Sequence, residues 1–161
     1  VEEGLEIIGF EHEIDGSGGP ALQMPAGGSL NPASHETVEK RMHYVKQDGG
    51  TVFKFAVRAM QDAARVVLDD AGFSIADVKF VVPHQANIRI VDAVAERLEV
   101  PKERMIVNLD RYGNTSSATI PIAYDELVRS GRLEPGDLVL FTGFGGGFTW
   151  GAVLFRHTIR N

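Results

Sequence analysis

The sequence predicts an α/β fold built on a five-stranded mixed sheet flanked by helices. From residue 51 onward, apolar runs of strand length alternate with amphipathic segments of helix length. Alternation of this kind implies parallel strands joined by right-handed crossovers. A short glycine turn joins the last two apolar runs and adds an antiparallel strand. With 161 residues, the chain is expected to form one domain, residues 1–161, around one core.

Strand-like segments are apolar, short and bounded by turn residues. Five segments of the chain meet this description, at residues 5–14, 78–82, 104–109, 137–144 and 148–156. Residues 15–33 are rich in Gly, Pro, Ser and Asn instead, which predicts a long surface loop after the first strand.

Residues 51–71 form the clearest predicted helix. Their apolar residues recur with helical spacing, and Gly72 stands where a C-terminal cap belongs. The apolar face is wide and rich in alanine, so we expect burial against a sheet or another helix. In the chain alone, we expect its broad side to leave an exposed apolar patch. Three further helices are predicted, at 34–46 with Ser34 as cap, at 87–98, and at 116–129 with Ser116 as cap.

Composition narrows the functional classes. Hydrophobic residues make up 43% of the chain and charged residues 24%, as in ordinary globular proteins. The net charge of −6 argues against nucleic acid as the main partner, because binding to its backbone needs a basic surface. No apolar run reaches the length that spans a bilayer, and the acidic amino terminus is unlike a signal peptide. With no cysteine, the chain has no disulfide or thiolate metal site, and the cytoplasm is the default location.

His84 and Asn114 hold equivalent places in two successive strand–loop units. His84 follows the apolar run FVVP, and Asn114 comes soon after MIVNL. Residues beyond the carboxyl ends of neighbouring parallel strands lie at the edge where α/β sheets bind ligands. Pro83 favours extended backbone before the histidine and fixes the turn. A histidine at a strand end often only bonds a loop, but the pairing with Asn114 favours a shared pocket.

A glycine-rich turn separates the last two predicted strands. Its glycines, Gly143, Gly145, Gly146 and Gly147, lead into the strand-like run FTWGAVLF. A dinucleotide-binding loop would instead open a helix with GxGxxG. One interpretation is a plain hairpin in which glycine supplies positive φ. Because a two-residue turn needs fewer glycines, we favour a backbone that approaches a substrate closely.

Three segments together resemble a known family. PHQAN at 83–87, YGNTS at 112–116 and FGGGFTWG at 144–151 are similar, in this order, to beta-ketoacyl-acyl carrier protein synthase III, the enzyme that starts fatty acid chains. The resemblance covers nearly the whole chain but only the carboxy-terminal half of the family. It implies half of a thiolase-like fold. The amino-terminal half, which by the resemblance carries the nucleophilic cysteine, is absent from this sequence. A chain that starts at Val1 without methionine is expected to be a fragment, a processed half or one of two separate chains.

The resemblance implies a decarboxylative Claisen condensation of an acyl-coenzyme A primer with malonyl-acyl carrier protein. Both halves of this reaction place negative charge on a thioester oxygen, and His84 and Asn114 are expected to hold it with two uncharged N–H donors. Asparagine cannot act as a base, so the pair suits an oxyanion clamp better than acid–base catalysis. By the same resemblance, the N–H of Gly146 joins the acyl oxyanion hole, and Phe144 walls the pocket beside it.

Binding surfaces are implied less directly. Asn87 matches a position that faces the pantetheine arm, although it equally fits an ordinary N-cap of the following helix. Arg89 matches a position that faces the carrier protein. Four more cations either extend this docking surface or form an ordinary solvated helix face. Glu96 adds a negative charge that weakens the basic patch. The four cations are Lys54, Arg58, Arg65 and Arg97.

The resemblance implies no metal or redox cofactor, and coenzyme A and phosphopantetheine act as substrate carriers. His35 and Glu39 have helical i,i+4 spacing, but two ligands in a polar helix do not make a metal site. The full enzyme is expected to be a homodimer. Two alternatives remain open: a related Cys–His–Asn acyltransferase or polyketide synthase of secondary metabolism, and a non-catalytic binding or dimerisation domain, which only the missing cysteine supports.

Overall fold

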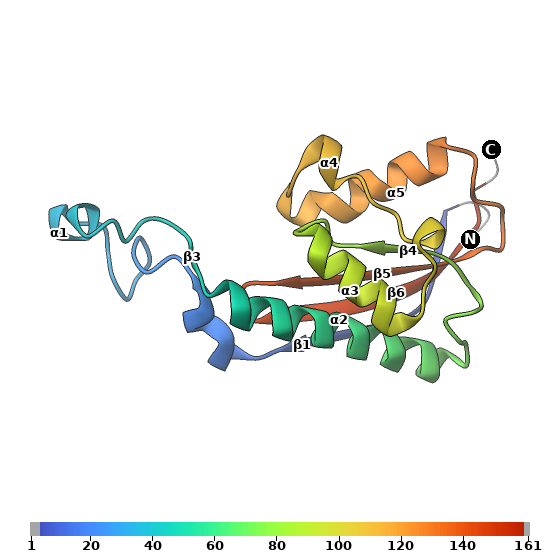
Figure 1. The fold of residues 1–161 in the computed structure, drawn as a ribbon, viewed down its shortest axis with the longest axis horizontal. Coiled ribbons are helices and arrows are strands. Elements are labelled where there is room, and N and C mark those ends of the chain that lie inside the picture. Colours follow the sequence, from blue (N-terminus) through green and yellow to red (C-terminus); the bar gives the residue numbers. More distant parts are fainter. Residues whose placement is uncertain (1–3, 160–161) are drawn as a thin grey trace.

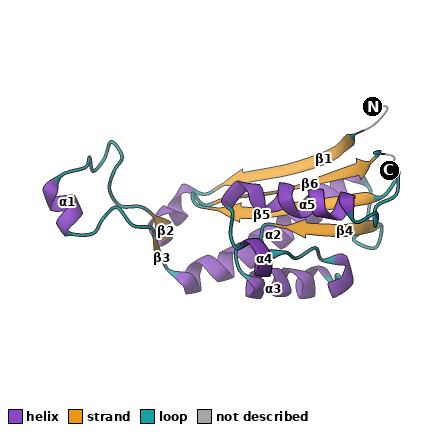
Figure 2. Ribbon diagram, turned by 90° about the horizontal axis from the view of Figure 1, so that it is seen from above, coloured by secondary structure: helices purple, strands orange, loops and turns teal. Residues whose placement is uncertain are grey.

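A mixed four-stranded sheet organises the chain, and the computed structural model describes residues 4–159 of it. The strands lie side by side in the order β1, β6, β5, β4 (Figures 1 and 2). β4 and β5 pair in parallel, while β6 runs antiparallel to both of its neighbours. The strands span Leu5–Ile14 (β1), Val78–Pro83 (β4), Leu138–Gly145 (β5) and Thr149–His157 (β6).

Helices cover both faces of this sheet. α2 and α3 share one apolar cluster with the sheet, and α5 shares a second cluster on the opposite face. A separate arm carries α1 and a two-stranded ribbon, β2 with β3, and projects beyond the sheet (Figures 1 and 2). The helices span His35–Glu39 (α1), Gly49–Ala71 (α2), Ile88–Leu98 (α3), Leu109–Tyr112 (α4) and Thr119–Arg129 (α5). Short 3-10 helices span Gly16–Ala21 (η1), Lys102–Arg104 (η2) and Ser116–Ala118 (η3), and the ribbon strands are Leu22–Gln23 (β2) and Lys46–Gln47 (β3).

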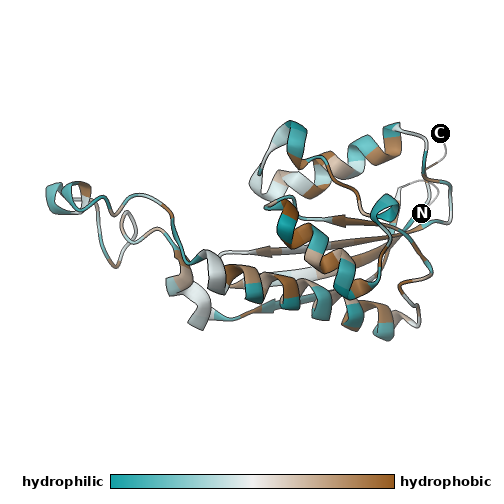
Figure 3. Cartoon of the chain, in the orientation of Figure 1, coloured by the Kyte–Doolittle hydropathy of each residue, from teal (hydrophilic) through white to brown (hydrophobic). Residues whose placement is uncertain are grey.

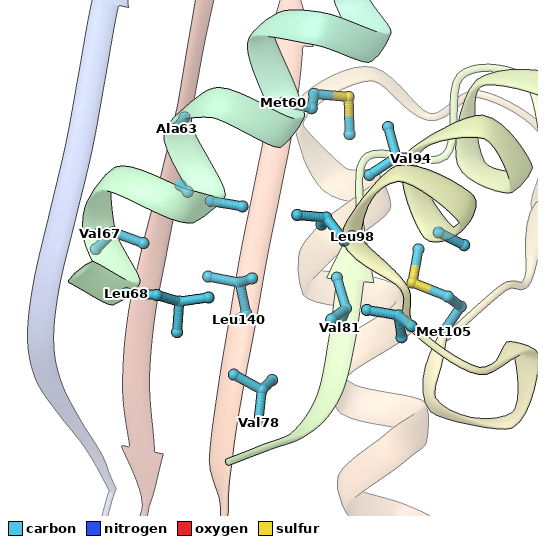
Figure 4. Packing of buried hydrophobic residues seen from close by; sticks show 14 of the residues in the cluster. Met60, Ala63, Val67, Leu68, Val78, Val81, Val94, Leu98, Met105 and Leu140 are labelled. Carbon is cyan, nitrogen blue, oxygen red and sulfur yellow. The ribbon is translucent and has the colours of Figure 1, made fainter. Parts of the chain in front are cut away.

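The larger core lies between α2, α3 and the sheet. Leu68 of α2 faces Leu140 of β5, and Leu98 of α3 lies between Met60 of α2 and Val81 of β4 (Figure 4). All five side chains are buried. α2 is capped at both ends, by the side chain of its preceding aspartate and by a left-handed glycine, which the sequence predicted for the C-terminal end.

The prediction of a fifth strand at residues 104–109 is wrong. Met105 makes only an isolated parallel bridge to Val81 of β4. The side chain of Gln85 takes the place of further ladder bonds: its Nε2 donates to the carbonyl of Ile106 at 3.1 Å, and its Oε1 accepts the N–H of Asn108 at 3.2 Å. Because this fully buried side chain pairs the backbone, the segment runs beside β4 without joining the sheet.

Two predicted helices begin or end elsewhere. The helix predicted at 34–46 stops at Glu39, because Arg41 adopts a left-handed backbone with φ of 52°. Ser34 does cap it, as predicted. The helix predicted from Ser116 begins at Thr119: Ser116 has a φ of 55° and lies in the 3-10 turn η3, so it is not the cap. Likewise, the loop predicted at 15–33 contains η1 and β2.

Exposed apolar side chains lie elsewhere than expected. The apolar face of α2 is buried within the chain, and its outward side is mostly hydrophilic (Figure 3). Large exposed side chains gather instead on β1, where Phe10 is 74% exposed, and in the arm, where Leu30 is 90% exposed. Among the described residues, no helix is long and apolar enough to cross a membrane.

Candidate active site

His84 directly follows β4, at the carboxyl end where this strand pairs in parallel with β5. Pro83 is paired with Thr142 of β5, and the N–H of His84 continues the pairing by donating to the carbonyl of Thr142 at 2.8 Å. The histidine backbone is therefore held by the sheet, while its side chain extends past the strand. This is the edge at which α/β sheets bind ligands.

The imidazole of His84 is partly buried, and that burial lowers its pKa below the usual value of 6.5. Burial therefore favours the uncharged ring. Its Nδ1 lies 2.6 Å from the hydroxyl of Thr119, at the start of α5. Within residues 4–159, Nε2 forms no hydrogen bond and is not enclosed by protein, so it remains free for a ligand.

Asn114 lies in the loop between α4 and η3 rather than directly after a strand. Its Oδ1 accepts the N–H of Ser116 at 2.9 Å, which orients the carboxamide. The oxygen is thereby engaged locally, and the exposed NH2 group is left as the donor. An asparagine held in this way presents N–H bonds outward and suits an anionic oxygen.

A chain of contacts joins the two residues. The Thr119 hydroxyl beside His84 also lies 3.0 Å from the carbonyl of Ser116, whose N–H bonds Asn114. The three links bring residues of the two predicted loops to one edge of the sheet. Convergence of the His84 and Asn114 side chains on one substrate atom stays a prediction.

Glu126 of α5 fixes the loop that leads to Asn114. Its carboxylate accepts hydrogen bonds from Asn108 at 2.9 Å, from both terminal nitrogens of Arg111 at 2.6 and 2.7 Å, and from the hydroxyl of Tyr112 at 2.7 Å. These donors, first the Asn108 amide, lower the pKa of Glu126 to about 2. The carboxylate thus stays charged and anchors α4 to α5.

The glycine turn spans Gly146 to Phe148, between β5 and β6. Gly147 has a φ of 148°, and a Cβ there would lie 2.8 Å from the side chain of Thr149, so this position requires glycine. At Gly146 a Cβ would meet Leu22 only in ordinary contact, at 3.8 Å. Its predicted role as an oxyanion donor stays a prediction.

Successive residues of β5 face opposite sides of the sheet. Gly143 faces His84 and α5: a Cβ there would lie 3.6 Å from both the His84 Cβ and the Ile120 side chain. Phe144 belongs instead to an aromatic cluster on the α2 side, with its ring centroid 5.8 Å from that of Phe55 and 4.9 Å from that of Phe148. Whether Phe144 also walls a substrate pocket stays a prediction.

The predicted binding residues lie on the surface. Asn87 is exposed and caps α3 by accepting the N–H of Arg89 at 2.9 Å, so the capping interpretation is confirmed. Arg89 is exposed as well. Lys54 and Arg58 project from α2, where the Arg58 guanidinium lies 5.9 Å from the Phe55 ring centroid.

The guanidinium groups of Arg65 and Arg97 already form hydrogen bonds where α2 packs against α3. Arg97 donates to the Gln61 side chain at 3.2 Å, and Arg65 donates to the carbonyl of Arg97 at 3.2 Å. Asp62 also follows Arg58 by four residues, which places a negative charge in the basic row. The docking role of these cations stays a prediction.

The described residues contain a large hollow, but it lies away from His84. Residues 4–159 contain no group of three or more His, Cys, Asp or Glu side chains able to hold a metal ion. An open hollow of about 640 Å³ lies at the opposite edge of the sheet, where Val78 begins β4 and Leu138 begins β5. It is far from the strand ends that carry the histidine, so it takes no part in the site.

Sequence reasoning missed Thr119 and Glu126. Thr119 is 35 residues from His84, and Glu126 is 15 residues from Arg111. Only the short spacing between Asn114 and Thr119, within NTSSAT, hinted that the helix start belongs to the site. Gln85 is adjacent to His84 in the sequence, but no sequence signal indicated that its side chain forms hydrogen bonds with the backbone.

Solved structures with a similar arrangement of elements include a 3-oxoacyl-[acyl-carrier-protein] synthase III and a priming beta-ketosynthase. The 3-oxoacyl-[acyl-carrier-protein] synthase III from Aquifex aeolicus matches with a TM-score of 0.83 and 41% identity, over 98% of this chain and 46% of that one. A priming beta-ketosynthase from the R1128 polyketide biosynthetic pathway matches with a TM-score of 0.78 and 35% identity, over 94% of this chain and 45% of that one. The fold of this chain is therefore half of a thiolase-like fold, similar to the matching part of those structures.

The family is narrower than that class. Residues 68–157 match the family described as 3-Oxoacyl-[acyl-carrier-protein (ACP)] synthase III C terminal, and the chain belongs to it. The beta-ketoacyl-[acyl-carrier-protein] synthase III of Desulfitobacterium hafniense is 53% identical over 160 residues, which cover 99% of this chain and 48% of that protein. The chain thus spans about half the length of the curated relatives it matches.

Proposed function

We propose that the chain is the carboxy-terminal catalytic half of a beta-ketoacyl-acyl carrier protein synthase III. The observation that carries this proposal is the chain of hydrogen bonds from His84 through Thr119 and Ser116 to Asn114, at the carboxyl ends of the parallel strands. Two neutral N–H donors stabilise an oxyanion without protonating it. The identity of its relatives supports the same reaction class.

The proposed reaction has two bond changes at the malonyl thioester. Loss of carbon dioxide leaves its electron pair on the thioester enolate, whose oxygen His84 and Asn114 hold. The enolate carbon then attacks an acyl thioester on the cysteine of the amino-terminal half, and the cysteine thiolate leaves. The N–H of Gly146 supplies one donor to the oxygen of that acyl group, with the cysteine N–H as the other.

Partners follow from the substrates. An acyl-coenzyme A supplies the primer, and an acyl carrier protein supplies the malonyl group through its phosphopantetheine arm, with no further cofactor. The exposed Asn87 and Arg89 lie at the start of α3, next to the histidine loop, which supports a role in receiving that arm and its carrier. We further propose a cytoplasmic homodimer of the complete protein.

Alanine substitution of His84 and Asn114 in the full-length protein tests this function. Each variant should decarboxylate malonyl thioester about a hundred- to a thousandfold more slowly, as expected when one oxyanion donor is lost. His35→Ala, an exposed histidine in α1, is the matched control and should keep full activity. Arg89→Glu should raise KM for malonyl-acyl carrier protein but not for a small malonyl thioester. Full decarboxylation by the His84 variant would refute the proposal.

A second candidate is a priming ketosynthase of polyketide synthesis. It is favoured by the 35% identity to the R1128 enzyme, which covers 94% of this chain. The chemistry at His84 and Asn114 is the same, so the choice of primer distinguishes the two. A full-length protein that extends only primers foreign to fatty acid synthesis would favour this candidate.

A further inference from the structure

The hydroxyl of Thr119 is placed to decide which nitrogen of His84 carries the hydrogen. Thr119 is only 2% exposed, and its Oγ1 lies 2.6 Å from Nδ1 of the imidazole. An uncharged imidazole has one N–H, and a hydroxyl has one hydrogen to donate. Either the hydroxyl donates to Nδ1, with the ring hydrogen at Nε2, or Nδ1–H donates to the hydroxyl and Nε2 is bare.

The surroundings of the hydroxyl allow it to face the imidazole. The hydroxyl has a second possible acceptor, the carbonyl of Ser116, to which it can donate at 3.0 Å, but this carbonyl already accepts the backbone N–H of Thr119. Turning the hydroxyl toward Nδ1 therefore leaves no buried acceptor without a partner. Among the residues that the structure describes, Thr119 is the one hydrogen-bond partner of the His84 ring.

Only one of the two tautomers suits the proposed reaction. A bare Nε2 is an acceptor and repels an enolate oxygen, whereas Nε2–H donates to it. We propose that Thr119 is a positioning residue, whose hydroxyl donates to Nδ1 of His84 and so holds the hydrogen at Nε2, facing the substrate. This inference rests on the proposed enolate-stabilising function. It assigns to the first residue of α5 a part in catalysis without contact to the substrate.

Thr119→Val and Thr119→Ser separate the hydroxyl from the shape of the side chain. Valine keeps the volume and loses the donor, so decarboxylation of malonyl thioester by the full-length enzyme should fall by roughly tenfold or more. The loss is smaller than for removal of a whole donor, since the ring still visits the active tautomer. Serine keeps the hydroxyl and should restore the rate. Acyl transfer to the cysteine of the other half should change far less in both variants.

Nitrogen NMR of the full-length enzyme labelled with 15N-histidine gives a direct readout, because protonated and bare ring nitrogens have distinct shifts. The His84 signals, identified by their loss in His84→Gln, should show hydrogen at Nε2 in the natural protein and a mixture in Thr119→Val. Hydrogen at Nδ1 in the natural protein would overturn the inference, even if neither Thr119 variant folds. Unchanged decarboxylation by folded Thr119→Val would overturn it as well. If His84→Ala itself decarboxylates normally, the proposed function fails and this inference falls with it.

Discussion

Gln85 shows that one buried side chain can take the place of several backbone hydrogen bonds. Its amide donates to the carbonyls of Pro83 at 2.7 Å and Ile106 at 3.1 Å, and accepts the N–H of Asn108. Substitution by leucine has nearly the right volume but leaves these three backbone groups unpaired, each of which costs about 1–3 kcal/mol when buried. We expect Gln85→Leu to lower the free energy of unfolding by about 2 kcal/mol or more, measured by urea denaturation of the full-length protein.

An exposed glutamine is the control for this change. Gln47 lies on the surface of the ribbon, so Gln47→Leu should leave the unfolding free energy within about 0.5 kcal/mol of the natural value. Equal destabilisation by the two leucines would show that Gln85 acts through its polarity in general rather than through these three bonds.

Single residues of the site were predictable where their neighbours in sequence define them. His84 after its strand, and Asn87 as a cap, depend on residues within two or three positions, and both were found. Thr119 was not, because its contact with His84 joins positions 35 residues apart. No local pattern encodes a hydrogen bond of that separation, whereas the fold of α5 onto the sheet creates it.

At the scale of elements, the carboxylate of Glu126 joins α4 to α5. α4 has four residues and lacks a side-chain cap, so its position depends on the bonds of Glu126 to Asn108, Arg111 and Tyr112. We expect Glu126→Gln to loosen the loop that carries Asn114 and to lower decarboxylation several-fold, with little change in acyl transfer. Asp125→Asn, which breaks only the exposed pair with Arg129, is the matched control.

The same carboxylate gives a pH dependence of definite sign. Its pKa falls from 4.5 to about 2 on folding, so the charged form is favoured in the folded state. The resulting stabilisation is fully present above pH 4.5 and is lost as the pH falls toward 2. The difference in unfolding free energy between the natural protein and Glu126→Gln should therefore shrink between pH 6 and pH 2, in denaturant titrations across this range. A constant difference would contradict this origin.

The helices predicted best were those whose signals for starting and ending lie in or next to their own residues. α2 and α3 carry an apolar face, a cap and a stop signal within their own residues, and their bounds agree with the prediction to within about two residues. The strand predicted at 104–109 has suitable composition but lacks the pairing, because Gln85 occupies its backbone groups. Composition describes what a segment can form, whereas a neighbouring side chain decided what this segment forms.

At the scale of the whole molecule, the chain alone exposes apolar surface on β1 and the arm. Ile7 and Phe10 on β1, and Leu30 and Val45 in the arm, are all more than 60% exposed. Surface of this kind is typical of an interface. We expect the isolated chain to associate or aggregate in analytical ultracentrifugation and to lack condensing activity. Joined to a cysteine-bearing amino-terminal half, it should be well dispersed and form ketoacyl product.

Paired charge substitutions serve as the control for association. Ile7→Lys with Phe10→Lys should reduce association of the isolated chain, whereas Lys79→Ala, at the other edge of the sheet, should not. Condensing activity from the isolated chain would contradict the division of catalytic groups, since it would require a nucleophile other than cysteine.

The opposed directions of Gly143 and Phe144 restrict how the length of this protein can vary in evolution. Loss or gain of one residue inside β5 would exchange the two faces, so that a bulky ring would meet His84 and a bare glycine would meet Phe55. Substitutions within β5 are open to selection, but deletions and insertions there are not. Length changes are expected to accumulate instead in segments whose residues are exposed, such as 27–33 in the arm.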